Sequence, residues 1–407
     1  MTDASHASHA STATEIANTF TRQRSVPIPS LNLSVEEYRH PGTGALHLHL
    51  SSDSPENVFM VALRTVPEDS TGVAHILEHT ALCGSERYPV RDPFFMMLRR
   101  SLNTFMNAFT SSDWTAYPFA TQNRKDFGNL LDVYLDAVFF SRLDPLDFAQ
   151  EGHRVEFEND DRDQALTFKG VVFNEMKGAM SSTPSVLWDR LCFELFPSNT
   201  YHFNSGGDPE AIPDLTYQQL RDFYAEHYHP SNAIFLTFGD IPAADHQRVF
   251  ESAVLHRFDA LNRKVEVALE TAFTEPQSAT HTYAMDPEED IQNKTHLIMG
   301  WKLGESADLT AMLEAQLVAS VLMENSASPL MHYLETTTLG TAPSPLCGLE
   351  ESMREMVFCC GIEGSDTTHA VAFEAAVLDC INSVAEHGIA AEKVEAILRQ
   401  IELHQRE

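Results

Sequence analysis

Apolar residues along the first part of the chain follow two different spacings. They recur at every second position over residues 45–50, and the run 58–66 is apolar almost throughout, which is typical of strands. Helical spacing follows over residues 72–83 and again over 127–140. This mixture of strands and helices predicts an α+β fold.

Three more segments extend the pattern. Residues 102–119 are rich in Phe, Ser and Thr and predict a strand that is interrupted at Pro118, because proline cannot donate to a β-ladder. A loop with two prolines is predicted before this strand. Residues 166–180 predict one helix, with Glu175 in its middle.

A helix is more strongly indicated over residues 215–228. Thr216 followed by Gln219 is a capping-box pattern, in which each side chain satisfies a backbone N–H at the start of a helix. A strand is predicted next, over residues 233–239.

The composition changes near residue 257, which predicts a domain boundary. Scattered acidic residues and threonines without firm periodicity mark a linker, and a second set of strands and helices follows it. The predicted elements are strands at 296–303 and 356–362 and helices at 309–322, 367–384 and 391–405. We therefore predict a flexible leader (1–24), a first α+β domain (25–256), a linker and boundary region (257–293) and a second α+β domain (294–407).

The second domain is predicted to be incomplete. The last helical segment is strongly amphipathic, yet the chain stops at Glu407 without a glycine or asparagine cap and without a helix-breaking residue. A natural chain can end in a frayed helix, but an uncapped helix at the end of a chain is also typical of a truncation.

The charge composition of the chain disfavours some classes of binding partner. The 59 acidic residues outnumber the 27 Lys and Arg and give a formal charge of −32, which disfavours binding to nucleic acid or to anionic membranes. No apolar run approaches the roughly 20 residues of a membrane span. Residues 1–19 lack the features of a secretory signal, and no arginine precedes Arg22. These features predict a cytoplasmic, bacterial-like location rather than the mitochondrial matrix.

The chemistry is concentrated in the motif His75-Ile-Leu-Glu-His79. On a helix, positions i and i+4 share one face, so both imidazoles can reach one ion. Zinc suits two imidazoles and a carboxylate with one position open for water, and it lowers the pKa of that water toward about 7. Glu78 can take the proton and later deliver it to a leaving amine. The alternative is an amphipathic helix with two surface histidines.

The third ligand is expected to be a carboxylate on another element. Glu175 stands in an otherwise apolar run and is a candidate, although it could also pair with Lys177 or face solvent. Spacing alone leaves other candidates open, namely Glu151, Glu156 and Glu158. Cys83 follows His79 by four residues, and we expect a packed or redox-sensitive thiol there rather than a ligand.

The motif and the blocks around it resemble the pitrilysin-like (insulinase, M16) zinc metallopeptidases, in particular their presequence-protease branch. The resemblance is dense over about residues 72–240 and thinner beyond. The matching blocks are 80–85 (TALCGS), 88–94 (YPVRDPF), 102–110 (LNTFMNAFT), 150–152 (QEG), 171–178 (VVFNEMKG), 205–209 (SGGDP) and 227–232 (HYHPSN).

The resemblance implies roles for individual residues. His75 and His79 would bind one zinc ion per chain, Glu175 would be the third ligand and Glu78 the general base. The segment Asn107-Ala108-Phe109 would bind an extended peptide by adding it to an edge strand. For Asn107 the alternative is a turn or strand-end residue that bonds to its own backbone.

The resemblance also implies a fold and an activity. The family's fold has two halves, each made of two related α+β domains, around a closed chamber that admits peptides and small unfolded chains. This chain would supply the N-terminal half alone, so it is expected to bind zinc but to cleave peptides poorly without a C-terminal half. In the expected reaction, zinc-bound water attacks the peptide carbonyl. Cationic peptides are a further expectation from the acidic charge. The alternative function is a non-catalytic scaffold or processing-complex subunit of the same fold.

Overall fold

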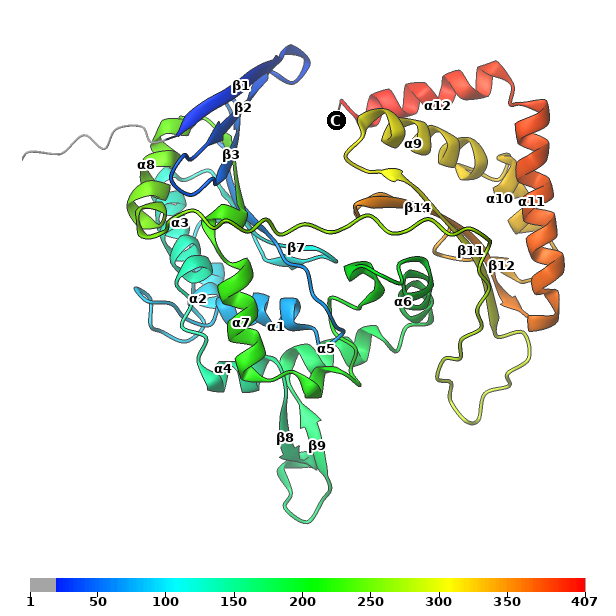
Figure 1. Cartoon of the computed structure of the whole chain (residues 1–407), viewed down its shortest axis with the longest axis horizontal. Coiled ribbons are helices and arrows are strands. Elements are labelled where there is room, and N and C mark those ends of the chain that lie inside the picture. The colour runs from blue at the N-terminus through cyan, green and yellow to red at the C-terminus, as the bar shows by residue number, and fades with distance from the viewer. Residues whose placement is uncertain (1–19, 407) are drawn as a thin grey trace, which may run out of the picture.

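An eight-stranded mixed sheet forms the first half of the molecule in the computed structural model, which describes residues 20–406 (Figure 1). The strand order is β1-β2-β3-β10-β4-β7-β5, and β6 pairs with β7 beside β5. The strands are β1 (Thr21–Ile28), β2 (Leu33–Arg39), β3 (Leu46–Ser51), β4 (Asn57–Arg64), β5 (Asn103–Met106), β6 (Phe109–Thr110), β7 (Trp114–Thr121) and β10 (Ala233–Gly239).

Burial alternates along the central strands, as the sequence pattern predicts. In β4, the side chains of Phe59, Val61 and Leu63 are fully buried, and their neighbours are partly exposed. The first half also contains helices α1 (Val73–Ala81), α2 (Pro93–Arg100), α3 (Arg124–Phe139), α4 (Pro145–Glu151), α5 (Val171–Ala179), α6 (Thr183–Leu195), α7 (Tyr217–His227) and α8 (Ala243–Ala253). The predicted capping box of α7 is present, with Thr216 and Gln219 bonded to each other's backbone.

The predicted interruption at Pro118 is wrong, because Pro118 lies inside the continuous strand β7. Its carbonyl oxygen accepts a hydrogen bond from the N–H of Asn107, in the break between β5 and β6. The nitrogen and the carbonyl of one strand residue point to the same side, so the missing N–H also faces this break. Proline is tolerated there because no ladder bond is lost.

The single helix predicted over 166–180 is also wrong, because two elements share this segment. A protruding hairpin, β8 (Arg154–Phe157) and β9 (Leu166–Lys169), ends where α5 begins. Gly170 separates β9 from α5, and a Cβ there would lie 1.9 Å from the carbonyl oxygen of Gly152. A long-range contact between two glycines therefore sets the start of the helix.

Other elements appear where the sequence pattern predicts none. Helix α2 occupies the segment predicted as a proline-containing loop, with Pro93 at its start, a position where its missing N–H costs nothing. Strand β1 begins at Thr21, inside the predicted leader 1–24, and residues 1–19 of that segment lie outside the described residues.

The second half repeats the α+β plan on a smaller scale. Its four-stranded sheet has the order β11-β14-β12, with β13 also on β14. The strands are β11 (Thr295–Glu305), β12 (Ala342–Pro343), β13 (Gly348–Glu350) and β14 (Glu355–Ser365), and the helices are α9 (Leu309–Met323), α10 (Pro329–Thr336), α11 (Ala370–His387) and α12 (Ala391–His404). The α+β fold class is thus confirmed, whereas the exact domain boundaries stay a prediction.

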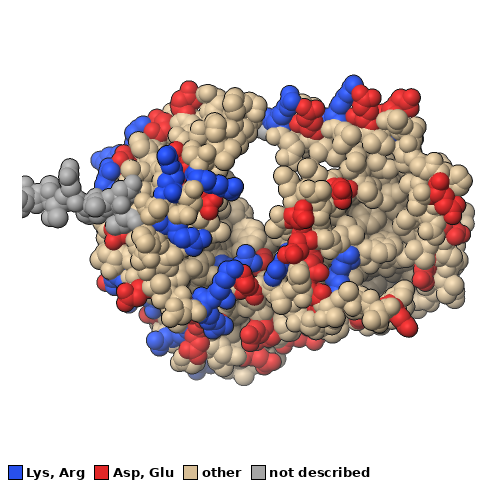
Figure 2. Space-filling model, turned by 45° about the horizontal axis from the view of Figure 1, so that its top comes forward, with Lys and Arg blue, Asp and Glu red and all other residues tan. Residues whose placement is uncertain are grey.

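An extended segment between Arg257 and Thr295 connects the halves (Figure 1). It is anchored rather than loose, because the buried side chain of Glu270 accepts hydrogen bonds from the N–H and the hydroxyl of Ser198, and its own N–H donates to Glu355. Figure 2 shows an opening between the two halves. Among residues 20–406, no helix has both the length and the apolar character needed to cross a membrane.

Candidate metal centre and peptide-binding edge

Helix α1 presents both histidines of the motif on one side. Its buried residues, such as Ile76 and Leu77, fix the helix in the core, while His75 and His79 remain partly exposed. Gly72 precedes the helix with φ of 71°, and a Cβ there would lie 2.8 Å from the carbonyl oxygen of Gly206. Glycine therefore allows the loop at Gly206 to approach the start of α1.

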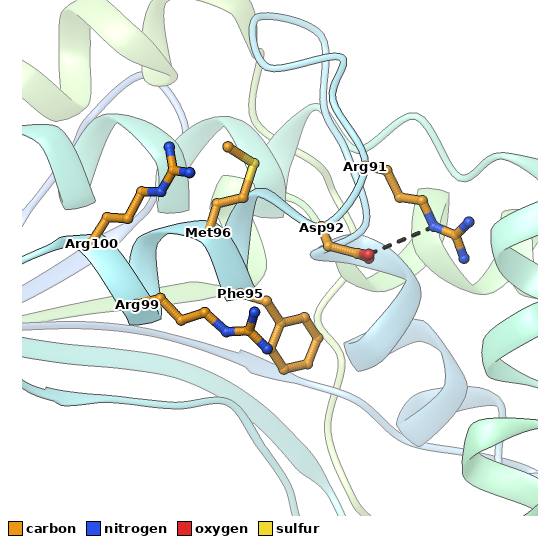
Figure 3. Close-up of a pocket in the computed structure, with 6 residues that line it drawn as sticks. All are labelled: Arg91, Asp92, Phe95, Met96, Arg99 and Arg100. Carbon is orange, nitrogen blue, oxygen red and sulfur yellow. Dashed lines mark ion pairs between the residues drawn. The ribbon is translucent and has the colours of Figure 1, made fainter.

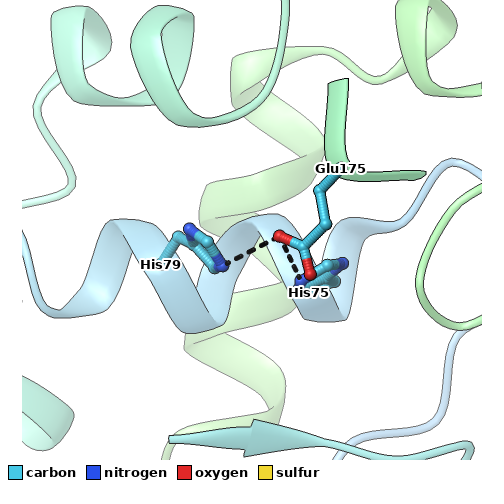
Figure 4. Close-up of side chains that lie close together, drawn as sticks. All are labelled: His75, His79 and Glu175. Carbon is cyan, nitrogen blue, oxygen red and sulfur yellow. Dashed lines mark ion pairs between the residues drawn. The ribbon is translucent and has the colours of Figure 1, made fainter. Parts of the chain in front are cut away.

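Glu175 reaches over from α5 to the same place (Figure 4). Its Oε2 lies 3.8 Å from Nε2 of His75 and 4.0 Å from Nε2 of His79. The three residues offer ligand atoms that all lie within 4.8 Å of one another. Tetrahedral zinc with bonds of about 2 Å separates its ligand atoms by about 3.3 Å, so these distances are close to those of a metal-bound set, and the half-exposed side chain of Glu175 has room to adjust.

The other ring nitrogen of each histidine is already occupied. Nδ1 of His75 lies 3.0 Å from the carbonyl oxygen of Gly206, and Nδ1 of His79 lies 3.1 Å from Oε2 of Glu151. Such partners fix the ring orientation and the tautomer, which leaves each Nε2 free to bind a metal. The arrangement therefore fits a metal ion held by two imidazoles and one carboxylate.

The pair formed by His79 and Glu151 is electrostatically coupled. Burial alone lowers the pKa of His79, but the hydrogen bond to Glu151 and the charges of Glu78, Glu151 and Glu175 outweigh it and raise that pKa. Burial likewise raises the pKa of Glu151, but hydrogen bonds from His79 and Gln150 outweigh it and lower that pKa. Glu151 is thus a charged partner of a histidine in the cluster rather than a member of it.

The other candidates for the third metal ligand lie away from the histidine pair. Glu156 pairs with Arg154 and with Lys169 on the hairpin, and Glu158 follows that hairpin strand. Cys83 is buried and its thiol donates to the backbone oxygen of His79, and burial raises the pKa of the thiol. A protonated, packed thiol is a poor nucleophile and a poor ligand.

Glu78 lies on α1 beside the cluster and is only 8% exposed. Its Oε2 accepts a hydrogen bond of 2.6 Å from the hydroxyl of Thr110 in β6. Neither Thr110 nor the contact of Glu151 is predicted from the sequence, because each contact joins residues that are far apart in the chain.

The segment Asn107–Phe109 lies at the edge of the large sheet. Strands β5 and β6 pair with β7 and form the last position in the strand order. Oδ1 of Asn107 accepts a hydrogen bond from the N–H of Ala108, so the local backbone contact expected as the alternative for Asn107 is present. The ring of Phe109 is 42% exposed and stacks with that of Phe105.

A pocket of about 520 Å³ lies along α2 and contains none of the three metal-cluster residues (Figure 3). Arginines and apolar side chains line it together, and an ion pair joins Arg91 to Asp92. The lining residues are Arg91, Asp92, Phe95, Met96, Arg99 and Arg100. The acidic net charge of the chain therefore does not extend to this surface.

Curated relatives resemble almost the whole chain. Mitochondrial presequence protease of Xenopus tropicalis is 45% identical over 390 residues, which is 94% of this chain and 38% of that protein. The mouse (Mus musculus) protein of the same name is 42% identical over 386 residues, 94% of this chain and 37% of that protein. The chain thus spans less than half the length of these relatives.

The names of these relatives contradict the predicted cytoplasmic, bacterial-like location, because they are mitochondrial proteins. That prediction rested on the composition of residues 1–19. A targeting segment is an address that a receptor reads, and the composition of residues 1–19 is not a sufficient guide to it.

Solved structures share the fold at low identity. A protease from Helicobacter pylori aligns with a TM-score of 0.65 and 18% identity, covering 91% of this chain and 84% of that one. Pitrilysin aligns with a TM-score of 0.57 and 16% identity, covering 91% of this chain and 38% of that one.

Two family models match successive parts of the chain. The model described as "Insulinase (Peptidase family M16)" matches residues 64–184, which contain the metal cluster, and the model described as "Peptidase M16 inactive domain" matches residues 214–401. Membership of this metallopeptidase family implies a metal cofactor. With both models matched and presequence proteases as relatives, the chain belongs to the insulinase (M16) family of peptidases.

Proposed function

We propose that the protein is a zinc-dependent endopeptidase that degrades peptides and small unfolded polypeptides. The observation that carries this proposal is the convergence of His75, His79 and Glu175 beside the buried carboxylate of Glu78. Two imidazoles and a carboxylate suit zinc and leave one coordination position open. The similarity to presequence proteases supports peptides as substrates.

Zinc held there would polarise the scissile carbonyl and make water more acidic. Glu78 would take a proton from the attacking water and return it to the leaving amine. Glu151 would hold the ring of His79 in orientation. The segment Asn107–Phe109, with the backbone of Ala108 facing outward, would hold the peptide in an extended form along the sheet edge, which gives broad sequence recognition.

A second half, supplied by a longer chain or in trans, would close a chamber around the substrate. The relatives' greater length supports this partner, and their names support a mitochondrial location for this protein as well. We also propose a preference for cationic peptides, because the chain has a net charge of −32. The arginines along α2 would act against this preference, because they favour acidic groups. Charge-reversed peptide pairs at low salt would measure the balance, and equal cleavage would refute the cationic preference.

The test compares the unaltered chain with Glu78→Gln, using a quenched fluorescent peptide and enzyme in excess. We expect both proteins to bind one zinc ion and only the unaltered chain to cleave, in a reaction that a chelator stops and added zinc restores. A non-catalytic scaffold of the same fold, the second candidate, would show no zinc-dependent cleavage and no effect of the substitution. That result would refute the proposal.

A further inference from the structure

Thr110 touches both parts of the proposed machinery, the sheet edge and the base. It is the last residue of β6, and β6 pairs with β7 through Phe109 opposite Ala116 and Thr110 opposite Thr115. Its hydroxyl donates to Oε2 of Glu78 at 2.6 Å. The hydroxyl of Thr110 is the donor of this bond, and the oxygen of Glu78 is the acceptor.

The backbone of Thr110 faces away from β7. The N–H groups of Asn107 and Ser111 donate to β7 carbonyl oxygens, at Pro118 and Trp114. Alternate residues of a strand point to opposite edges, so residues 107, 109 and 111 face β7 and residues 108 and 110 face the free edge. The N–H and carbonyl of Thr110 are therefore placed to pair with an added peptide.

The hydroxyl of Thr110 also continues a row of hydroxyls from two buried threonines. It lies 3.3 Å from the hydroxyl of Thr115, which lies 2.9 Å from that of Thr65, and both of these threonines are fully buried. A side chain supported in this way keeps one orientation. Its bond occupies Oε2 of Glu78 and leaves Oε1 as the oxygen for proton transfer.

We infer that Thr110 is a positioning residue that couples peptide binding at the edge strand to the orientation of the base Glu78. A peptide that pairs with the outward backbone of Thr110 fixes this residue, and the hydroxyl of the same residue then holds the carboxylate toward the water. This inference rests on the proposed function. It adds a residue beyond Asn107–Phe109 and gives it a role in turnover rather than in affinity.

The test uses the full chain with Thr110→Val, which removes the hydroxyl and keeps the shape, and Thr110→Ser, which keeps the hydroxyl. We expect the valine variant to lower kcat by about 10- to 100-fold, the range for one hydrogen bond to a charged group, with KM changed less than threefold. The serine variant should recover most of kcat. Bound zinc and thermal midpoint should match those of the unaltered chain.

Thr104→Val is the matched control, because Thr104 lies on β5 of the same edge and also donates to a carboxylate, that of Glu56, away from the cluster. We expect it to leave kcat unchanged. Peptide binding is measured separately from turnover in two variants that lack the proposed base, Glu78→Gln and Glu78→Gln with Thr110→Val. Their dissociation constants for the peptide should agree within threefold. If the valine variant does not fold, Thr110→Ala replaces it.

Two outcomes overturn the inference while the proposed function stands: a valine variant with kcat within twofold of the unaltered chain, or a serine variant that is as slow as the valine variant. If the unaltered chain shows no cleavage beyond that of Glu78→Gln, the proposed function and the inference both fall.

Discussion

Oε2 of Glu151 lies 3.1 Å from Nδ1 of His79, on the side of the imidazole that faces away from Glu175. The same ring therefore has a carboxylate at each nitrogen, one buried and one half exposed. The buried carboxylate fixes the ring, and the exposed one is free to move onto a metal. This division of roles gives the first prediction.

We expect Glu151→Gln to weaken zinc binding by about 10- to 100-fold, because a neutral amide orients His79 less firmly and makes its Nε2 less basic. Competition with a fluorescent chelator measures the affinity. Glu156→Gln is the control, since Glu156 pairs with Arg154 and Lys169 on the exposed hairpin. Equal affinities for the two variants would contradict the assigned role of Glu151.

The glycine contact at the start of α5 gives a second prediction. Gly170→Ala would place a Cβ 1.9 Å from the carbonyl oxygen of Gly152, so we expect a loss of about 1–3 kcal/mol in unfolding free energy. Zinc affinity should fall too, because α5 carries Glu175. Gly178→Ala on the same helix meets nothing within 4 Å and should gain up to about 1 kcal/mol. Urea unfolding measures the unfolding free energy of both variants. Equal changes in the two variants would contradict the prediction.

A buried histidine network predicts acid sensitivity. His47 and His49 on β3 share the hydroxyl of Thr237, each at 2.8 Å, and Nε2 of His246 on α8 is buried without a partner among the described residues. Burial lowers the pKa of His47, and burial followed by the charge of His49 lowers the pKa of His246 to about 3. These rings stay neutral in the fold.

In the unfolded chain these histidines take up protons at the ordinary pKa of about 6.5, whereas in the folded chain they stay neutral. The free energy of unfolding therefore falls as pH drops below about 6.5. The cost is up to about 1.4 kcal/mol per pH unit for each such histidine. We expect His246→Leu to lose less stability than the unaltered chain between pH 7 and pH 5, as measured by urea midpoints. Parallel losses in the two proteins would contradict this.

The chain alone should bind zinc but cleave poorly, because the candidate metal ligands lie within residues 75–175 while the proposed chamber needs a second half. We expect added second half, expressed separately, to raise kcat/KM by at least tenfold without changing the zinc content. Full activity of the chain alone would show that a closed chamber is not required.

Features set by local chemistry could be predicted from the sequence. The i, i+4 spacing of His75 and His79 placed both on one helical face, and the Thr216–Gln219 pattern located the start of α7. The choice of Glu175 as third ligand is a prediction from the family resemblance, because spacing alone does not separate it from Glu151.

Features set by long-range contacts could not be predicted. The start of α5 depends on Gly152 meeting Gly170, the tolerance of Pro118 depends on the break between β5 and β6, and the partner of Glu78 comes from another strand. No local pattern encodes these pairs, since each joins segments that only the fold brings together.

The most direct test of the central claim is anomalous scattering at the zinc edge from crystals of the zinc-loaded chain. The account predicts one strong peak, about 2 Å from Nε2 of His75, Nε2 of His79 and a carboxylate oxygen of Glu175. A peak elsewhere, or zinc bound without Glu175, would contradict it.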